Sequence, residues 1–346
     1  MQIRLINRAE DLLLIRGAWN ELFQEGDYSL FQSFEFNYYS WICELIIDKR
    51  NQLSVTIITE EEQIIAIFPF YVDSKRDLRF INDNHSDFCD YLRKEAINFI
   101  AVYDFLKQEI RFNTMSLINL KEESNIYKKV KDINIKDTVF LSKQEYSTLN
   151  IDKGIFPYNV PHYRSHQKHR INKAIRKHLQ KETIVLMKDS NSFPKQEILL
   201  LKDKMIHSGI RKKDFMHNNR LLLIEDLYNS GIVTLNVMRD KDGFNAVNIL
   251  LKGSSNSFMF WIDIFDETQM INLSAYCNVI KYFSSTESID VNFGRGRYFY
   301  KESNFAPEFH KLHQILIFSS KWKKLWFFIV NMVRGKLISV YKKITQ

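Results

Sequence analysis

The stretch that decides the fold is Ile232–Ile264, which reads IVTLNVMRDKDGFNAVNILLKGSSNSFMFWIDI. It contains three runs rich in β-branched, aliphatic and aromatic residues, and the turns Lys241–Gly243 and Gly253–Asn256 separate them. Runs of this composition between glycine-containing turns predict antiparallel strands. We therefore expect a three-stranded meander over residues 232–239, 245–252 and 257–264.

Helices and strands are predicted on both sides of this meander. A basic helix at 162–181, a strand at 183–188 and helices at 194–208 and 218–229 precede it. A helix at 271–286, a strand at 289–293, a glycine loop at 294–296 and a last strand at 312–318 follow it. This mixed order indicates an α/β or α+β fold.

The first half of the chain carries a shorter version of the same pattern. Apolar residues predict helices over 10–24 and 33–48, a hairpin of 53–59 with 64–72, and strands at 78–82 and 112–119 around a helix at 94–108. The stretch 121–160 is less regular and predicts a domain boundary. We expect two related domains, 1–155 and 156–320, and a tail, 321–346.

Composition limits the class of protein. The chain has 346 residues, 45% of them hydrophobic, which suffices for one large or two moderate domains. Its three cysteines, Cys43, Cys89 and Cys277, are odd in number and far apart. They predict neither a disulfide framework nor a zinc site. A reducing cytoplasm is therefore the expected compartment.

The net charge of +8 is concentrated in two segments. Pro161–Glu182 has seven Lys or Arg and one acid, and Phe309–Gln346 has eight and no acid. Such patches attract phosphates, anionic lipid or nucleic acid. The helix at 162–181 has two interpretations: a solvated face on a packed helix, or a site for the phosphates of a nucleotide sugar, a tRNA or a lipid pyrophosphate.

The tail mixes basic residues with tryptophan. Trp322 and Trp326 stand among apolar residues and seven Lys or Arg. Basic, Trp-containing amphipathic helices lie in membrane interfaces. We expect peripheral membrane contact through 321–343, at the inner face of the membrane; the alternative is a helix that packs on the body with its lysines outward.

No sequence motif predicts a nucleophile with its base or a metal site. The patterns GxSxG, HExxH, GxGxxG and the phosphate loop of nucleotide-binding enzymes are missing, and the nine histidines show no ligand spacing. We expect no metal. Transfer of an acyl group from an activated donor to an amine needs neither; it needs positioning, a proton acceptor and donors for the oxyanion.

Two stretches carry candidate site residues. Asn292–Lys301 ends a buried strand in two glycines, two arginines, three aromatics and a lysine, which suits an anionic or sugar-like ligand; the alternative is a glycine turn with solvated arginines. His85–Leu92 alternates acids with aromatics, so Asp87 and Asp90 are candidate proton acceptors or amine ligands. The alternative there is a simple turn.

These pieces, in order, resemble the CelD-like acyltransferases of the GNAT superfamily, which are common in bacterial polysaccharide gene clusters. The resemblance covers about residues 10–318 and rests on Trp19, Phe31–Ser33, Phe68–Phe70, Ser86–Tyr91, the helix Tyr163–Gln180 and Asn292–Lys301. It implies tandem GNAT-like domains related to the Fem-type aminoacyltransferases of peptidoglycan, followed here by a basic amphipathic C-terminal helix.

The resemblance also implies a function. It implies an N-acyltransferase that uses acetyl-CoA or another acyl-CoA and acts on an amino sugar or other precursor, small or lipid-linked, of a surface polysaccharide. Substrate would lie between the halves. The implied residues are Asp87 and Asp90 for catalysis, His85, Arg295, Tyr300 and Lys301 for substrate, and Asn272, Leu273 and Ser274 for the donor.

One departure leaves the donor open. The family's CoA turn contains glycine, but Gln269–Ala275 has none. A helix start binds phosphate through its free amides. Without glycine in the turn, a phosphate approaches the backbone less closely. Aminoacyl-tRNA is therefore the alternative donor, and a non-catalytic binding role in polysaccharide assembly is a third hypothesis. DNA is not an expected partner.

Overall fold

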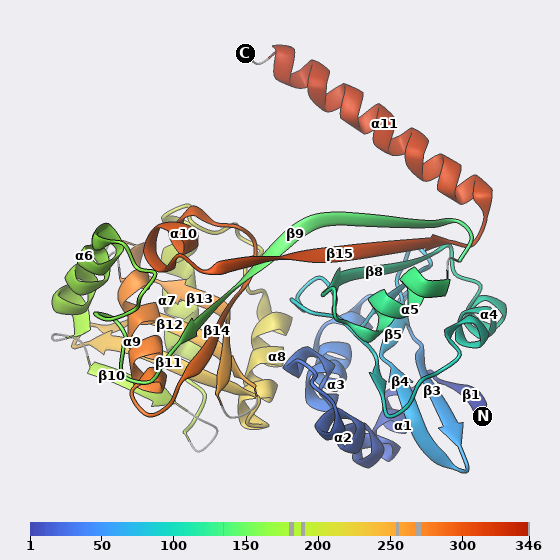
Figure 1. The fold of residues 1–346 in the computed structure, drawn as a ribbon, viewed down its shortest axis with the longest axis horizontal. Coiled ribbons are helices and arrows are strands. Elements are labelled where there is room, and N and C mark those ends of the chain that lie inside the picture. The colour runs from blue at the N-terminus through green and yellow to red at the C-terminus, as the bar shows by residue number, and fades with distance from the viewer. Residues whose placement is uncertain (134, 180–182, 188–190, 254–255, 268–270, 345–346) are drawn as a thin grey trace. The chain divides into compact units, whose positions relative to one another are not determined.

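The computed structural model describes the whole chain except residues 134, 180–182, 188–190, 254–255, 268–270 and 345–346 (Figure 1). The chain forms two compact units, and neither is continuous in sequence. The first contains Met1–Asp27, Asp48–Lys143 and His313–Gln346; the second contains Tyr28–Ile47 and Gln144–Leu312. The chain passes from one unit to the other within β9 (Thr138–Ile151) and within β15 (Glu308–Phe318). The sequence predicts these boundaries at 155 and 320 instead.

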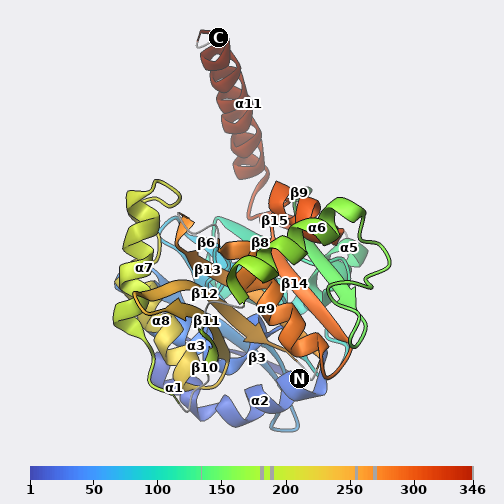
Figure 2. The same cartoon turned by 90° about the vertical axis from the view of Figure 1, so that its left-hand side faces the viewer.

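The second unit is built on the predicted meander (Figure 2). β11 (Val233–Asp240), β12 (Gly243–Lys252) and β13 (Ser257–Phe265) pair antiparallel in this order. β10 (Thr183–Met187) pairs with β11, and β14 (Ile289–Arg295) pairs with β13 in parallel and with β9 antiparallel. The predicted α/β class is confirmed.

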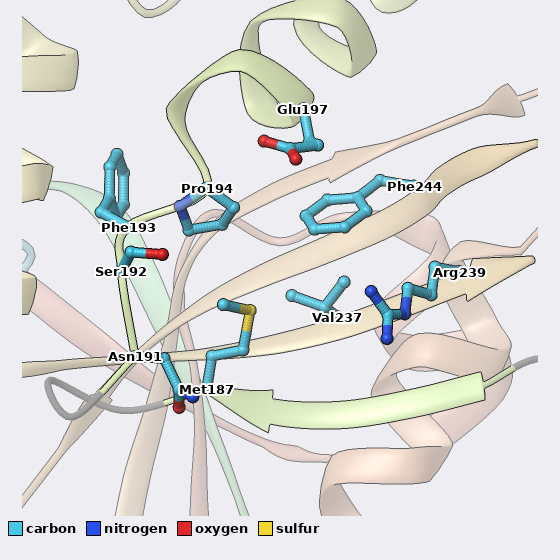
Figure 3. Close-up of a pocket in the computed structure, with 9 residues that line it drawn as sticks. All are labelled: Met187, Asn191, Ser192, Phe193, Pro194, Glu197, Val237, Arg239 and Phe244. Atoms are coloured by element: carbon cyan, nitrogen blue, oxygen red, sulfur yellow. The ribbon is translucent and has the colours of Figure 1, made fainter.

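Helices cover both faces of the sheet in the second unit. α9 (Asn272–Ser284) packs on β11 and β12, and Met238 and Ile271 share a buried cluster there. α7 (Lys195–His207) packs on β12 and β13. Val237 faces the start of α7 (Figure 3). Successive strand residues point to opposite faces, so Met238 points to the α9 side.

Further helices of the second unit flank these layers. α6 (Ser165–Ala174) continues into a π-helix (Ile175–Leu179), and both pack against α9. α8 (Asn218–Asn229) packs against α3 (Phe34–Cys43), which the sequence assigned to the first domain. The helix α10 (Phe299–Phe305) follows β14 and was not predicted.

The first unit has two sets of strands. β1 (Gln2–Ile6), β3 (Val55–Glu60), β4 (Gln63–Phe68) and β7 (Leu92–Arg93) form one sheet in this order. β8 (Thr114–Leu120), β6 (Asp77–Phe80), β5 (Phe70–Val72) and β2 (Gln52–Leu53) are neighbours in the other. The predicted strand 64–72 is thus split at Pro69, which has no N–H to donate to a ladder.

The helices of the first unit are α1 (Ala9–Leu14), α2 (Arg16–Glu25), α4 (Phe99–Ile110), α5 (Asn125–Ile133) and the C-terminal α11 (Lys321–Ile344). α4 and α5 contribute side chains to its core. The end of β15 pairs antiparallel with β8. The core is a continuous cluster that includes stacked Phe68 and Tyr91, with ring centroids 4.3 Å apart.

Candidate active site

Two parallel strands of the second unit separate near the middle of the sheet. β13 and β14 pair from Ser257 opposite Asp290 to Met259 opposite Asn292, whereas β13 continues to Phe265 and β14 to Arg295. Beyond the paired residues the facing backbone groups of the two strands diverge. Polar side chains gather at this divergence.

β13 has a β-bulge just after Met259, the last of its residues that pairs with β14. In the pairing with β12, Ile249 is opposite Ile262 and Leu250 is opposite Phe260, so Trp261 is the extra residue. The bulge shifts the alternation of side chains by one. Phe260 and Asp263 therefore both face Tyr276 of α9: the rings of Phe260 and Tyr276 are 4.3 Å apart, and Asp263 accepts a hydrogen bond from Tyr276. Bulges commonly re-aim a side chain beside an active site.

Asp263 is the centre of a hydrogen-bonded cluster. One carboxylate oxygen accepts from Nδ2 of Asn248 at 2.8 Å, and the other accepts from the hydroxyl of Tyr276. That hydroxyl lies 3.0 Å from the hydroxyl of Tyr300 in α10. The side chain of Asp263 is half-buried. The cluster thus joins a carboxylate to two phenols drawn from a strand and two helices.

The side-chain amides of two buried asparagines, Asn236 and Asn248, and of half-buried Asn278 support the cluster. Asn278 Nδ2 donates to Asn236 Oδ1 at 2.6 Å, and Asn236 Nδ2 donates to Asn248 Oδ1 at 2.8 Å. This series of hydrogen bonds holds Asn248 with its amide nitrogen toward Asp263. A fully paired buried network holds its members in one arrangement, so the carboxylate is positioned before any ligand binds.

The electrostatics make Asp263 more basic than a free carboxylate. Burial raises its pKa, against the hydrogen bonds from Tyr276 and Asn248 and the charges of Arg211 and Lys301. Burial and the neighbouring charge of Asp263 raise the pKa of Tyr276, and burial raises that of Tyr300. At neutral pH both phenols are therefore protonated donors. Strongly shifted groups that share one place are typical of catalytic sites.

The glycine loop after β14 is held by Lys301. The lysine is 1% exposed, and its Nζ donates to the carbonyl oxygens of Gly294, Arg295 and Gly296 at 3.1, 3.0 and 3.0 Å. Gly294 and Gly296 have φ values of 70° and 89°, which favour glycine. The substrate-binding role of Lys301 stays a prediction, and in the structure its ammonium positions the glycine loop.

The other predicted residues of this stretch differ in their contacts. Tyr300 belongs to the Asp263 cluster, as described. Arg295 is half-buried at the end of β14, where it pairs with Tyr146 of β9. Arg297 bonds Glu302 through Nε at 2.9 Å and lies on the ring of Phe309, which matches the solvated alternative for this arginine.

The predicted donor residues lie at the start of α9. Asn272 Oδ1 accepts from the N–H of Leu273 at 2.8 Å, and no side chain caps the helix at Ile271. Ser274 is fully buried, and its Oγ donates to the carbonyl of Ala174 at 3.0 Å. Ser274 therefore ties α9 to α6 and does not cap the helix. Residues 269 and 270 of the predicted turn lie outside the described residues.

The predicted acids lie in the first unit. Asp90 accepts from the backbone N–H groups of Tyr91, Asn125 and Ile126 at 2.9, 2.7 and 3.0 Å, so it holds the start of α5. Burial, opposed by these bonds, raises the pKa of Asp90 to about 7. Asp87 is buried and His85 is exposed. The catalytic role of the acids stays a prediction, and the contacts of Asp90 are those of a structural residue.

A cavity of about 360 Å³ lies on the α7 side of the sheet (Figure 3). Its lining includes Phe244 and Val237, with Arg239 and Glu197 as the charged groups. Met238, next to Val237, faces α9 instead. The cavity is therefore on the sheet face opposite the Asp263 cluster. Among the described residues, no three His, Cys, Asp or Glu side chains come together as metal ligands would.

Sequence reasoning missed Asp263, Tyr276, Asn248 and Asn236. A signal was available in the sequence: Asp263 is the one charged residue within SFMFWIDIF, and Asn236 and Asn248 interrupt apolar strands. A buried polar residue in a strand must be hydrogen-bonded. The bulge that turns Asp263 toward α9 leaves no comparable mark in the sequence.

Comparison with solved structures identifies the fold. The chain is similar to the C-terminal domain (DUF2156) of a protein from Agrobacterium fabrum proposed to be a lysylphosphatidylglycerol synthetase, with 9% identity, coverage of 93% and 96% of the two chains, and a TM-score of 0.59. It is similar to L-PGS from Bacillus licheniformis, with 9% identity, coverage of 90% and 92%, and a TM-score of 0.59.

A third similar structure is a tandem GNAT protein from the clavulanic acid biosynthesis pathway, with 7% identity, coverage of 92% and 99%, and a TM-score of 0.50. Neither a family model nor a curated protein matches the sequence. The CelD-like subfamily therefore stays a prediction. The two units of this chain together have the fold of a tandem GNAT protein.

Proposed function

We propose that the protein is an acyltransferase whose chemistry takes place at Asp263. The observation that carries this proposal is the placement of a basic, pre-positioned carboxylate just after the bulge of β13, where β13 and β14 diverge. The fold, which it shares with GNAT proteins, supports it.

The proposed reaction uses each member of the cluster. An amine attacks the acyl carbonyl of the donor, so an N–C bond forms and the bond from the carbonyl carbon to the leaving sulfur or oxygen breaks. Asp263 accepts the proton that the amine loses. The phenol of Tyr300, linked to Tyr276 at 3.0 Å, donates a proton to the leaving group and is reprotonated from solvent. A hydroxyl acceptor would follow the same path.

Acyl-CoA is the first candidate donor. The amides of the first turn of α9 stand at the end of β13, and a helix start favours a phosphate. Asn272, Leu273 and Ser274 contribute backbone to this turn, whereas the hydroxyl of Ser274 is used elsewhere. An amino sugar or another polysaccharide precursor is the acceptor that the resemblance implies.

Aminoacyl-tRNA is the second candidate donor, and one observation favours it. Arg170, Lys173, Arg176 and Lys177 are all exposed on α6 and the π-helix, which pack against α9. A row of cations beside a transfer site suits a phosphodiester backbone. The name of the similar Agrobacterium protein also refers to a lysyl group and a phospholipid.

Titration decides between these donors. Acetyl-CoA, CoA and aminoacylated tRNA are each titrated into the protein by calorimetry. The same tRNA without an aminoacyl group is the control for binding through its phosphates alone. We expect one donor to bind, and the Asp263→Asn variant to bind it equally while transferring slowly. Binding of neither donor would contradict the proposal and favour a non-catalytic role.

A further inference from the structure

The first two turns of the C-terminal helix α11 contact the rest of the first unit. The ring of Phe327 lies 5.2 Å from that of Phe318. Nζ of Lys323 donates to Oδ1 of Asn113 at 2.6 Å, and Nζ of Lys324 donates to the carbonyl of Thr138 at 3.5 Å. These contacts fix the start of the helix on the unit.

A second side of α11 is apolar and open to solvent. Trp322 is 79% exposed, Trp326 67% and Ile329 39%. Their spacing of four and three residues places them on one stripe of a helix, away from Phe327. In the sequence the same spacing continues with apolar residues, Val333, Leu337 and Val340. Two largely exposed tryptophans on one stripe are unusual for a surface in contact with water alone.

Charge distinguishes the partners that this stripe would accept. Residues 321–344 contain seven Lys or Arg and no acid. A second copy of the helix would bring like charges together, which opposes pairing. An anionic lipid surface attracts each of these residues. The combination of tryptophan on one side and lysine around it is that of helices lying in the membrane interface.

We propose that α11 lies in the interface of an anionic membrane leaflet, with Trp322, Trp326 and Ile329 at the boundary between headgroups and acyl chains. Basic residues of the helix other than Lys323 and Lys324, which bond to the first unit, supply the attraction to lipid phosphates. Within the described part of the chain no helix has the length and apolarity to cross a bilayer, and this binding mode requires none. The proposal is independent of the reaction at Asp263.

Vesicle binding of the full-length protein tests this proposal. The vesicles are phosphatidylcholine alone, and phosphatidylcholine with phosphatidylglycerol in equal parts. We expect co-sedimentation with the anionic vesicles that weakens as salt rises. Lys336→Gln combined with Lys342→Gln and Lys343→Gln should lower the affinity about a hundredfold, from about fivefold per charge at the surface.

The apolar stripe is tested separately. Trp322→Ser with Trp326→Ser should lower the affinity at least about tenfold, which corresponds to a loss of about 1.4 kcal/mol. Because both side chains are exposed, the thermal midpoint should not change. Leu14→Ser is the matched control, since Leu14 is 84% exposed in the same unit. Brominated acyl chains should quench the parent's tryptophan fluorescence, and this quenching should disappear in the double variant.

Three results would overturn the proposal. One is binding of the parent to neutral and anionic vesicles alike, or to neither. Another is unchanged affinity in the lysine and tryptophan variants. The third is a dimeric parent, by sedimentation velocity, that the tryptophan variant converts to a monomer without any effect of vesicles. That result would identify a second copy as the partner of the stripe.

Discussion

Replacing Asp263 by asparagine tests the candidate site most directly. The variant keeps the shape of the side chain but removes its basicity. Its carbonyl can still accept from Asn248, and its amide can donate to the hydroxyl of Tyr276, which then donates to Tyr300. Since every polar group of the cluster keeps a partner, the free energy of unfolding should change little.

Activity should respond very differently. Loss of a general base typically lowers a rate by about 10²–10⁴-fold, or about 3–5 kcal/mol in barrier. Burial raises the pKa of Asp263. The rate of the parent should therefore rise with pH through a midpoint above the ordinary carboxyl value of about 4, and this rise should be missing from the variant.

The assay is release of the leaving group in a single turnover, with the donor that titration identifies, as a function of pH. Asp266→Asn is the matched control. Asp266 is three residues after Asp263 in the sequence, but its carboxylate pairs with Lys204 at 3.2 Å. It should transfer at the parental rate. If Asp263→Asn also keeps the parental rate and pH profile, Asp263 is not the proton acceptor.

Three further predictions concern the surroundings of the site and the acid of the first unit. Lys301→Met should shift the pH midpoint of transfer upward, because the Lys301 charge lowers the pKa of Asp263; an unchanged midpoint in the pH profile would contradict this. Gly296→Ala should lower stability to urea by about 1–2 kcal/mol, the cost of a left-handed backbone, and impair transfer because the new Cβ meets the Tyr298 ring at 2.5 Å. The matched Gly154→Ala, with φ of 73° and no neighbour within 4 Å, should lose stability and keep activity. Asp90→Ala should unfold the first unit more easily, because three backbone N–H groups lose their acceptor.

The titration of Asp90 adds a pH dependence to the last prediction. Its pKa in the folded protein is about 7, above the unfolded value of about 4. Between these values the folded state holds the proton more tightly, so stability falls as pH rises. In Asp90→Asn that fall should be absent. Urea unfolding at several pH values measures both variants against the parent, and a parent whose stability does not fall over this range would refute the assignment.

The sequence was most informative where local chemistry alone decides the structure. Glycine turns delimit the meander, so β11, β12 and β13 begin and end close to their predicted bounds. The assignment was less accurate where tertiary contacts decide. Nothing in the composition of Thr138–Ile151 marks β9 as a strand of two units, and α3 has no local feature that assigns it to α8.

The site was predicted in part for the same reason. Tyr300 and the glycine loop stand in a compact motif, and the structure brings them into the candidate site. Ser274 and Asp90 have the residue types expected of ligands, but each bonds to backbone that lies far away in sequence. Asp263 depends on a one-residue register shift, which only the pairing with β12 reveals.

The interleaving of the two units along the chain has a consequence for biosynthesis. The first unit needs residues 313–318, since the end of β15 pairs with β8, and the second needs both Tyr28–Ile47 and the strand at 308–312. Neither unit is complete in a nascent chain until its residues of β15, within 308–318, have left the ribosome. Contacts between such distant segments are slow to form because long loops must close first. Partly synthesised chains would therefore expose the sheet edges that β9 and β15 later occupy.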